Sequence, residues 1–294
     1  MVGRIGDVRL TRLTTTQGNQ LYVDLLAGGA VGGGQLSPTS VLQVHRTLRR
    51  ALNDAVRWGL VDRNVAVDAK VPKPAERTFT VWTPEQSAWF LVSVADDRLY
   101  VLWLLALHTG MRRGELAGLR WPDVDLKTGK VSIVVQRTTD GFRVVTVAPK
   151  AGSRRVIQLA APVAAQVESH RDRQAKERAD RGIEPAGPDD TVFADELGRP
   201  YHPQRLRALF GRASERAGLP AIRLHDLRHT MASTALAGGI HPKIVQERLG
   251  HTNVAMTLDT YSHVTDTIQG EAAERLNVMM SAQPPLGDRR TKSS

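Results

Sequence analysis

Apolar residues recur at helical spacing along most of this chain. The clearest stripe follows Ser37, which has the residue type of a helix N-cap, and Pro38, which suits the first helical position. This stripe consists of Val41, Val44, Leu48, Leu52, Ala55 and Val56. Comparable patterns predict helices that begin near Thr83 and cover about Leu99–His108, Pro162–Arg181, Pro203–Ala217, His225–Ala237, His241–Leu249 and Val254–Tyr261.

Short runs rich in valine predict strands near the middle of the chain. They are Val131–Val135, Val144–Val147 and Val156–Leu159. Asp140-Gly141 between the first two runs is typical of a tight hairpin turn. The sequence therefore predicts a mainly α fold with a small antiparallel β-sheet.

A proline-containing segment divides the chain. Pro72 and Pro74 among charged residues favour an extended linker over residues 72–78. We expect a small helical domain at 1–71, a larger domain at 79–280 and a disordered polar tail at 281–294. The glycine run at 28–34 lacks the spacing of a phosphate-binding loop and predicts a flexible connector between two helices.

Composition narrows the classes of protein and of partner. A chain of 294 residues is long enough for two domains with separate cores. The formal charge of +10 and the pI near 10.4 favour a polyanionic partner such as nucleic acid, although a merely basic protein would share them. The absence of cysteine excludes disulfides and cysteine-ligated zinc. No apolar run reaches a membrane span and no signal-peptide layout is present, so we expect a cytoplasmic protein with no membrane partner.

Basic residues gather on the polar face of the helix that follows Ser37. His45 and four arginines lie on that face, which predicts either a helix laid along DNA phosphates or a solvated surface. A second basic cluster follows Pro149. The candidate DNA-binding residues from the two places are Arg46, Arg49, Arg50, Arg57, Arg154 and Arg155.

An ordered set of scattered residues has the chemistry needed to break a phosphodiester without a metal. Cations neutralise the phosphoryl oxygens, imidazoles donate or shuttle protons, and a phenol can act as the nucleophile. The candidate catalytic residues are Arg112, Lys150, His225, Arg228, His251 and Tyr261, and Glu115 is spaced to brace Arg112.

Each of these features is ambiguous when taken alone. His-x-x-Arg occurs three times, and the pairs that begin at His170 and His202 predict an exposed helix face and an isolated helix start. Only the pair at His225 is followed by an apolar-rich helix, Leu-Gly-His and a tyrosine. A lysine at a turn, such as Lys150, is commonly just exposed. Tyr261 is one of four tyrosines and, with a phenol pKa of about 10, needs neighbouring cations or a base.

In this order the motifs resemble those of the tyrosine recombinases, specifically the phage-type integrases, over nearly the whole chain. The matching segments are Thr109–Glu115, Leu224–Thr230, Leu249–His251 and Thr260–His263. The resemblance implies that Tyr261 forms a 3′-phosphotyrosyl bond while Arg112 and Arg228 hold the scissile phosphate. It also implies that His225 and His251 assist, that Lys150 protonates the leaving 5′-oxygen, and that no metal or nucleotide cofactor takes part.

The resemblance further implies an assembly and an architecture. Residues 1–71 would be a core-binding domain and residues 79–280 the catalytic domain of a two-domain, C-shaped clamp on double-stranded DNA. A homotetramer would act on two attachment sites, with Thr265–Met280 lent to a neighbour and a directionality factor as a further candidate partner. The core-binding domain is expected to be N-terminally truncated, because relatives usually carry a further helix before Ile5–Thr14.

Two other functions remain open from the sequence. A type IB topoisomerase-like nicking and closing enzyme would use similar residues without a specific site. A non-catalytic remnant of an integrase would bind DNA without cleaving it.

Overall fold

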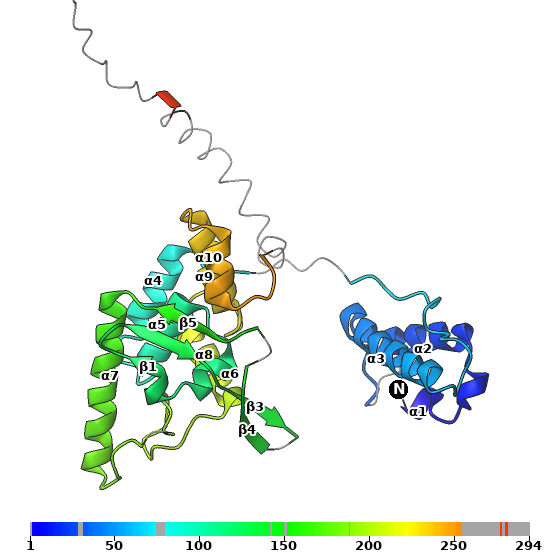
Figure 1. The fold of residues 1–294 in the computed structure, drawn as a ribbon, viewed down its shortest axis with the longest axis horizontal. Helices are drawn as coiled ribbons and strands as arrows, with labels where there is room; N and C mark the ends of the chain where they lie inside the picture. The colour runs from blue at the N-terminus through cyan, green and yellow to red at the C-terminus, as the bar shows by residue number, and fades with distance from the viewer. Residues whose placement is uncertain are drawn as a thin grey trace, which may run out of the picture. The chain divides into compact units, whose positions relative to one another are not determined.

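The computed structural model describes residues 2–28, 32–74, 80–141, 143–149, 152–187 and 189–254, together with residues 277, 280 and 281. Contacts divide the chain into two compact units, Met1–Thr78 and Phe79–Ser294 (Figure 1). No helix in the described part of the chain is both long and apolar enough to cross a membrane.

The first unit is helical. Its elements are α1 (Val2–Ile5), a 3₁₀ turn at Leu10–Arg12, α2 (Thr15–Ala27) and α3 (Pro38–Arg57). Thr14 and Gln17 form a capping box at the start of α2, and the Ser37 hydroxyl accepts a hydrogen bond from the Ser40 N–H at the start of α3, as its sequence predicts. The two long helices pack through Leu21, Tyr22, Leu25 and Val41.

The polar face of α3 differs from the prediction at one residue. His45 was expected beside the arginines, but it is buried, and its Nδ1 lies 2.9 Å from the Tyr22 hydroxyl. The buried hydroxyl and the buried imidazole provide each other's hydrogen-bond partner. The helical pattern of the sequence does not show whether a polar residue beside the apolar stripe is buried in this way or exposed. Arg46, Arg49 and Arg50 are exposed on the same helix.

The second unit is mainly helical with small antiparallel sheets. Its helices are α4 (Pro84–Ser93), α5 (Tyr100–Thr109), α6 (Arg113–Gly118), α7 (Ala161–Asp180), α8 (Pro203–Arg216), α9 (Asp226–Ala237) and α10 (Pro242–Leu249), with a 3₁₀ turn at Trp121–Asp123. Its strands are β1 (Val124–Asp125), β2 (Lys130–Ile133), β3 (Gln136–Asp140), β4 (Arg143–Val147) and β5 (Arg155–Gln158).

The strands form two sheets rather than one. β1, β2 and β5 make a three-stranded sheet, whereas β3 and β4 pair only with each other in a hairpin that turns at the expected Asp140-Gly141. The prediction missed β3, because Gln-Arg-Thr-Thr-Asp has no apolar alternation. β3 lies against α6 at Gly114 and Gly118, and none of its side chains is fully buried, so the strand can be polar throughout.

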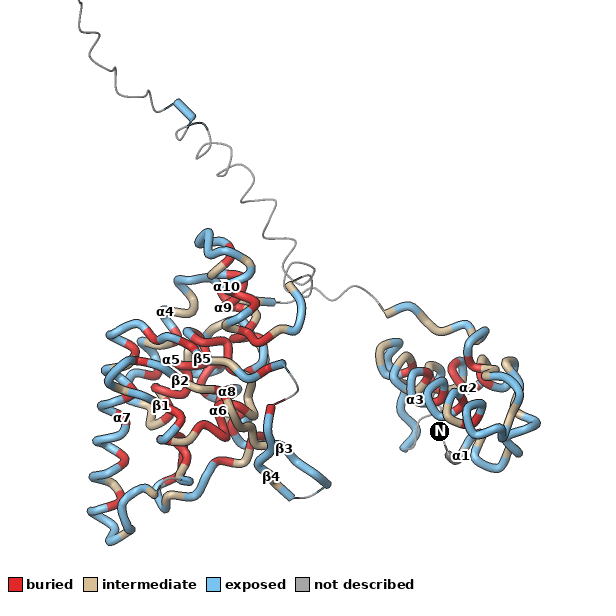
Figure 2. Tube along the Cα trace, viewed as in Figure 1, coloured by how far each residue is buried: buried red, intermediate tan, exposed pale blue. Residues whose placement is uncertain are grey.

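The core of the second unit surrounds α5. Every residue from Val101 to Leu107 is buried, and Figure 2 shows this helix in the buried interior. Aromatic side chains fill the space between α4, α5 and α8. They are Trp82, Phe90, Trp103 and Phe210, whose ring centroids lie 5.0–6.5 Å apart.

One residue of α7 also corrects the sequence analysis. His170 was expected on an exposed charged face but is 3% exposed, and its Nε2 lies 2.8 Å from the carbonyl oxygen of Val192. The charged pattern of α7 hid a narrow buried stripe, which also includes Gln174 and Arg178.

A glycine at the end of α5 allows α5, α9 and α10 to pack closely. Gly110 has a φ of +63°, and a Cβ built there would lie 2.8 Å from Leu249 Cδ2 and would clash with Met231 Cε. The chain leaves α5 at this point in a left-handed turn, which directs the next residues towards α6.

We expect Gly110→Ala to lower the free energy of unfolding by about 2 kcal/mol or more, from left-handed strain and overpacking. Gly211→Ala is the matched control, because Gly211 lies within α8 with no atom near its Cβ position. That substitution should stabilise the helix by up to about 1 kcal/mol. Chemical denaturation of both variants checks the prediction, and equal effects would contradict it.

Candidate active site

Four segments far apart in the sequence meet in the second unit. Arg112 is the residue just before α6, and Arg155 begins β5. His225 and Arg228 lie at the start of α9, and His251 follows the glycine that ends α10. Hydrogen bonds link these segments, so the fold itself brings together four of the six candidate catalytic residues.

Glu115 is the negative centre of this group and is 1% exposed. Its carboxylate accepts hydrogen bonds of 2.8 Å from both the backbone N–H and Nη1 of Arg112. Arg155 donates to the same carboxylate from Nη2 at 2.8 Å and from Nη1 at 3.1 Å. Burial raises the pKa of Glu115, but the hydrogen bonds and charges of Arg155 and Arg112 outweigh it and hold the pKa below its ordinary value. Glu115 is therefore ionised and orients both guanidinium groups.

Arg228 is held by two helix ends. It is 4% exposed, and it donates from Nη1 to the Gly110 carbonyl at 2.7 Å and from Nη2 to the Leu249 carbonyl at 2.6 Å. These carbonyls belong to the C-terminal ends of α5 and α10, where the helix dipole favours a cation. The plane of the guanidinium is thus fixed by the backbone.

Gly250 lets the chain turn sharply beside the arginines. Its φ is +64°, and a Cβ there would lie 3.1 Å from Arg155 Cδ and 3.2 Å from the Ser153 carbonyl oxygen. The Gly250 carbonyl accepts hydrogen bonds of 3.4 Å from Arg112 Nη2 and from Ser153 Oγ. A larger residue would push apart the segments that hold Arg112 and His251 in place.

The imidazoles of the group are neutral at neutral pH. Burial, then the charges of Arg228 and Arg112, lower the pKa of His251 to about 4. Burial and neighbouring His225 lower the pKa of His229 to about 4. The pKa of His225 is also lowered, by the protein packed around its ring and by Arg228, although the residue reaches the surface. Within the described ranges, no group of three or more His, Asp or Glu side chains is arranged as a metal site.

Two candidate residues, Lys150 and Tyr261, lie outside the described residues. Near Lys150, Gly152 lies against the loop after α10, since a Cβ there would be 3.4 Å from Thr252 Cγ2.

The other tyrosines have environments unlike that of a nucleophile. Tyr22 and Tyr201 are 1% and 7% exposed, and burial raises the pKa of both. Tyr100 is half-buried in α5. Burial disfavours the ionised phenolate and so makes a phenol less nucleophilic.

The candidate DNA-binding arginines divide by exposure. Arg154 is exposed, but the Arg155 side chain is 6% exposed and is committed to Glu115 and to the Arg248 carbonyl. Arg155 therefore links Glu115 to the end of α10. It does not lie on an open surface, where a residue that contacts a DNA phosphate would be expected. In the first unit Arg57 is exposed and pairs with Asp54.

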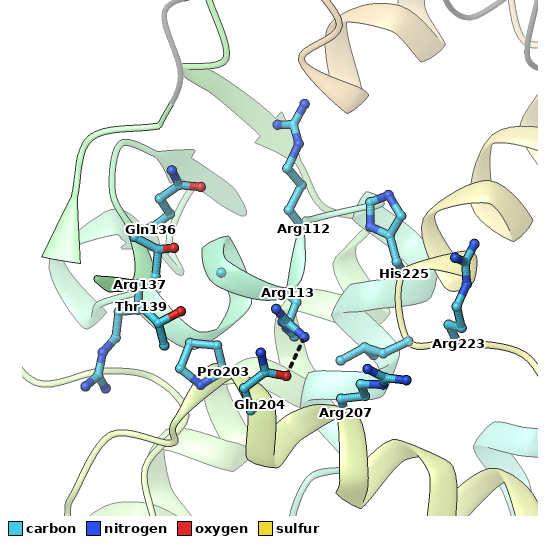
Figure 3. A pocket seen from close by; sticks show the side chains of 13 residues that line it. Arg112, Arg113, Gln136, Arg137, Thr139, Pro203, Gln204, Arg207, Arg223 and His225 are labelled. Carbon is cyan, nitrogen blue, oxygen red and sulfur yellow. Dashed lines mark hydrogen bonds between the residues drawn. The ribbon is translucent and has the colours of Figure 1, made fainter. Parts of the chain in front are cut away.

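A cavity of about 580 Å³ opens beside Arg112 and His225 (Figure 3). Arg113 and Arg207 line it, and neither was selected from the sequence. His229 was also missed. Its position directly after Arg228, one helical turn from His225, could have identified it.

Comparison with known proteins gives the family. The sequence profile of the Phage integrase family matches residues 85–267, a range that contains all six candidate catalytic residues. A tyrosine recombinase XerC-like protein of Caldanaerobacter subterraneus subsp. tengcongensis is 27% identical over 259 residues, which are 82% of this chain and 66% of the relative. The ICEBs1 integrase of Bacillus subtilis is 26% identical, over 83% of this chain and 67% of the relative. The chain thus spans about two thirds of the length of these relatives.

Solved structures share the fold. The Tn1549 transposon integrase in complex with transposon right end DNA aligns with a TM-score of 0.76 at 24% identity, over 93% of this chain and 89% of that chain. A lambda integrase dimer bound to a COC′ core site aligns with a TM-score of 0.60 at 18% identity, over 87% and 82%. The family profile covers more than half of the chain, and the chain therefore belongs to the phage integrase family.

Proposed function

We propose that this protein is a site-specific recombinase that cuts and rejoins DNA through a 3′-phosphotyrosyl intermediate, integrating or excising a mobile element. The observation that supports this most is the convergence of Arg112, Arg228, His225 and His251 from three separate segments, with Arg112 held by the buried carboxylate of Glu115 and both arginines acting on the two imidazoles. Two fixed guanidinium groups beside neutral imidazoles suit a phosphodiester whose negative charge grows in the transition state.

The two arginines would bind the scissile phosphate from different anchors. Glu115 sets the direction of Arg112, and the helix-end carbonyls set that of Arg228. A planar guanidinium fixed in advance donates to two phosphoryl oxygens without an ordering cost at the moment of reaction.

The proton transfers fall to the imidazoles, Lys150 and Tyr261. The Tyr261 oxygen attacks phosphorus and loses its proton, which a neutral imidazole can accept. The bond from phosphorus to the 5′-oxygen then breaks, and Lys150 gives that oxygen its proton. Rejoining reverses these steps, because the phosphotyrosyl bond conserves the energy of the broken phosphodiester. The contact between Gly152 and Thr252 supports this role, because Gly152 comes two residues after Lys150 and Thr252 directly follows His251.

The first unit would be the core-binding domain and would close a C-shaped clamp on the DNA. The exposed arginines of α3 support this, because phosphate contacts fix a protein on the duplex without reading its sequence. Tn1549 and lambda integrases in the solved structures are bound to DNA.

A homotetramer on two attachment sites would need a surface that receives a neighbour. An apolar cavity of about 730 Å³ lies between α4, α9 and α10, lined in part by Leu91, Met231, Ile240 and Ile244. The segment Thr265–Met280 has apolar residues at helical spacing and could fill it from another subunit. A lambda integrase tetramer bound to a Holliday junction has been solved. A directionality factor would be a further partner of such an assembly.

A topoisomerase-like enzyme and a DNA-binding remnant are the competing functions. The second would keep the Glu115 ion pairs and the DNA-binding surface but would form no covalent adduct. The first would relax supercoiled plasmid as a monomer with no preferred site.

We expect Tyr261→Phe to abolish covalent linkage to a nicked suicide substrate while leaving DNA affinity within about threefold, since only the nucleophile is lost. Denaturing gels detect the adduct, and a gel-shift assay reports binding. Tyr100→Phe is the matched control and should keep the adduct. A wild-type protein that binds but never forms an adduct would favour the remnant.

Glu115→Gln should slow adduct formation by about tenfold to a hundredfold, because Arg112 loses its ionic anchor and a small misplacement of a phosphate ligand is costly. Asp123→Asn is the control, since Asp123 is a buried carboxylate paired with Arg120. Both variants should lose stability, by up to about 3 kcal/mol. Quench-flow cleavage should separate them, and equal cleavage rates for the two variants at equal folded fraction would contradict the positioning role.

The histidines should make stability fall as the pH decreases. His251 and His229 have pKa values of about 4 in the folded protein and 6.5 when unfolded, so protonation favours the unfolded state. The stability that the neutral imidazoles contribute is complete above pH 6.5 and is lost on acidification towards pH 4. Urea unfolding across this range should show a shallower pH dependence in His251→Gln than in wild type, and parallel curves would contradict the prediction.

A further inference from the structure

The cavity beside Arg112 is strongly cationic. Five arginines line it together with His225, and no carboxylate occurs among the described residues of the lining. The arginines come from α6, β3, α8 and the segment before α9, and they are Arg112, Arg113, Arg137, Arg207 and Arg223. Figure 3 shows Arg113 close to Gln204 in the middle of the view, with Arg207 nearby and Arg137 on the β3 side.

Among the residues that the structure describes, two of these arginines form ion pairs. Arg112 pairs with Glu115 at 2.8 Å, and Arg223 pairs with Asp226 at 2.7 Å. Both carboxylates are buried behind the wall of the cavity.

Arg113 and Arg207 form no ion pair within the described ranges. Arg113 donates to the neutral amide oxygen of Gln204 at 3.2 Å, and no carboxylate in the described ranges pairs with it. Arg207 is exposed on α8 and makes no ion pair with the residues that the structure describes. Neighbouring guanidinium groups of like charge repel one another, so an anion between them would stabilise the arrangement.

Arg137 adds an independent observation. Its Nη1 is shielded from solvent, and no described group accepts a hydrogen bond from it. Burial lowers the pKa of Arg137. A shielded N–H without an acceptor costs stability, and the rest of this half-buried guanidinium is open to an anionic ligand.

We propose that this cavity binds the DNA backbone next to the scissile phosphate, with Arg113 and Arg207 as its principal phosphate ligands and Arg137 supporting them from β3. This inference rests on the proposed function, because Arg112 and His225 line the same cavity and would hold the scissile phosphate at one end of it.

The first test compares two arginines of one helix. Arg207→Gln removes a proposed phosphate ligand, whereas Arg205→Gln removes the same charge from a side chain that stacks 5.5 Å over the Tyr201 ring and does not line the cavity. Binding to a duplex that carries a candidate attachment site is measured by fluorescence anisotropy over a series of salt concentrations, with Tyr261→Phe in every protein so that chemistry does not contribute.

We expect Arg207→Gln, and likewise Arg113→Gln, to weaken binding and to reduce the slope of log affinity against log salt by about 1. Arg205→Gln should leave that slope unchanged. Equal slopes for Arg205→Gln and Arg207→Gln would overturn the proposal. Thermal melts check folding, and Arg207→Lys, which keeps the charge, should recover the slope.

A second test locates the phosphate. Methylphosphonate linkages, which lack the negative charge, are placed one at a time along each strand. The protein with Arg207 intact should lose affinity at one or two positions adjoining the scissile linkage, and Arg207→Gln should be insensitive to the same replacements. A loss that persists in Arg207→Gln would place Arg207 elsewhere and overturn the proposal.

A free phosphate ion could bind the same arginines, and experiments can distinguish it from the phosphates of DNA. If inorganic phosphate raises the melting temperature through Arg207 while DNA affinity is indifferent to Arg207→Gln, the cavity binds small anions and the proposal fails. If the proposed function is wrong, the wild-type protein forms no covalent adduct through Tyr261, a result that is separate from the binding measurements. The binding measurements do not depend on that adduct.

Discussion

The buried carboxylate of Glu115 is the interaction on which the candidate site depends. It joins α6 to β5 through Arg112 and Arg155, two residues separated by more than forty positions. A carboxylate shielded from water would be costly without partners, and removing either arginine would leave it with a single cationic partner. The site is therefore a unit, because Arg112 and Arg155 share both oxygens of the same carboxylate.

Arg228 is immobilised by different means. Carbonyl dipoles at two helix ends hold it, and these dipoles exist because Gly110 and Gly250 end α5 and α10 in left-handed turns. Backbone geometry, a local property of two glycines, thus helps to determine the position of a cation that lies 118 residues from Gly110 in the sequence. An arginine fixed by dipoles and one fixed by a carboxylate would present different net charge to a phosphate, which makes them unequal ligands.

Much of the fold could be predicted from local chemistry, and the exceptions have a common cause. Ser37 and Thr83 cap helices where their residue types and neighbours indicate, because capping is satisfied within one turn. His45 and His170 were misplaced because their burial depends on Tyr22 and Val192, which approach only in the folded chain.

In the candidate site, too, local motifs predict some of the residues, and others depend on contacts that form only in the folded chain. The motifs select Arg112, Glu115, His225, Arg228 and His251, and the structure brings these residues together. Nothing local distinguishes Arg155, which is buried, from Arg154, which is exposed, since the difference lies in a carboxylate forty residues earlier. Arg207 belongs to no motif, and only the packing of α6 against both β3 and α8 gives it a place in a cavity.

The cations and the imidazoles are electrostatically coupled, and this has a consequence for the proposed reaction. Arg112 and Arg228 help to keep His251 neutral in the free protein. A bound phosphodiester would offset part of their charge and so raise the pKa of the imidazole. Substrate binding would then move His251 from a poor proton carrier towards one that can accept and return a proton near neutral pH, where general acid–base catalysis is most efficient. The same arginines would thus bind the phosphate and make the proton transfer conditional on its presence.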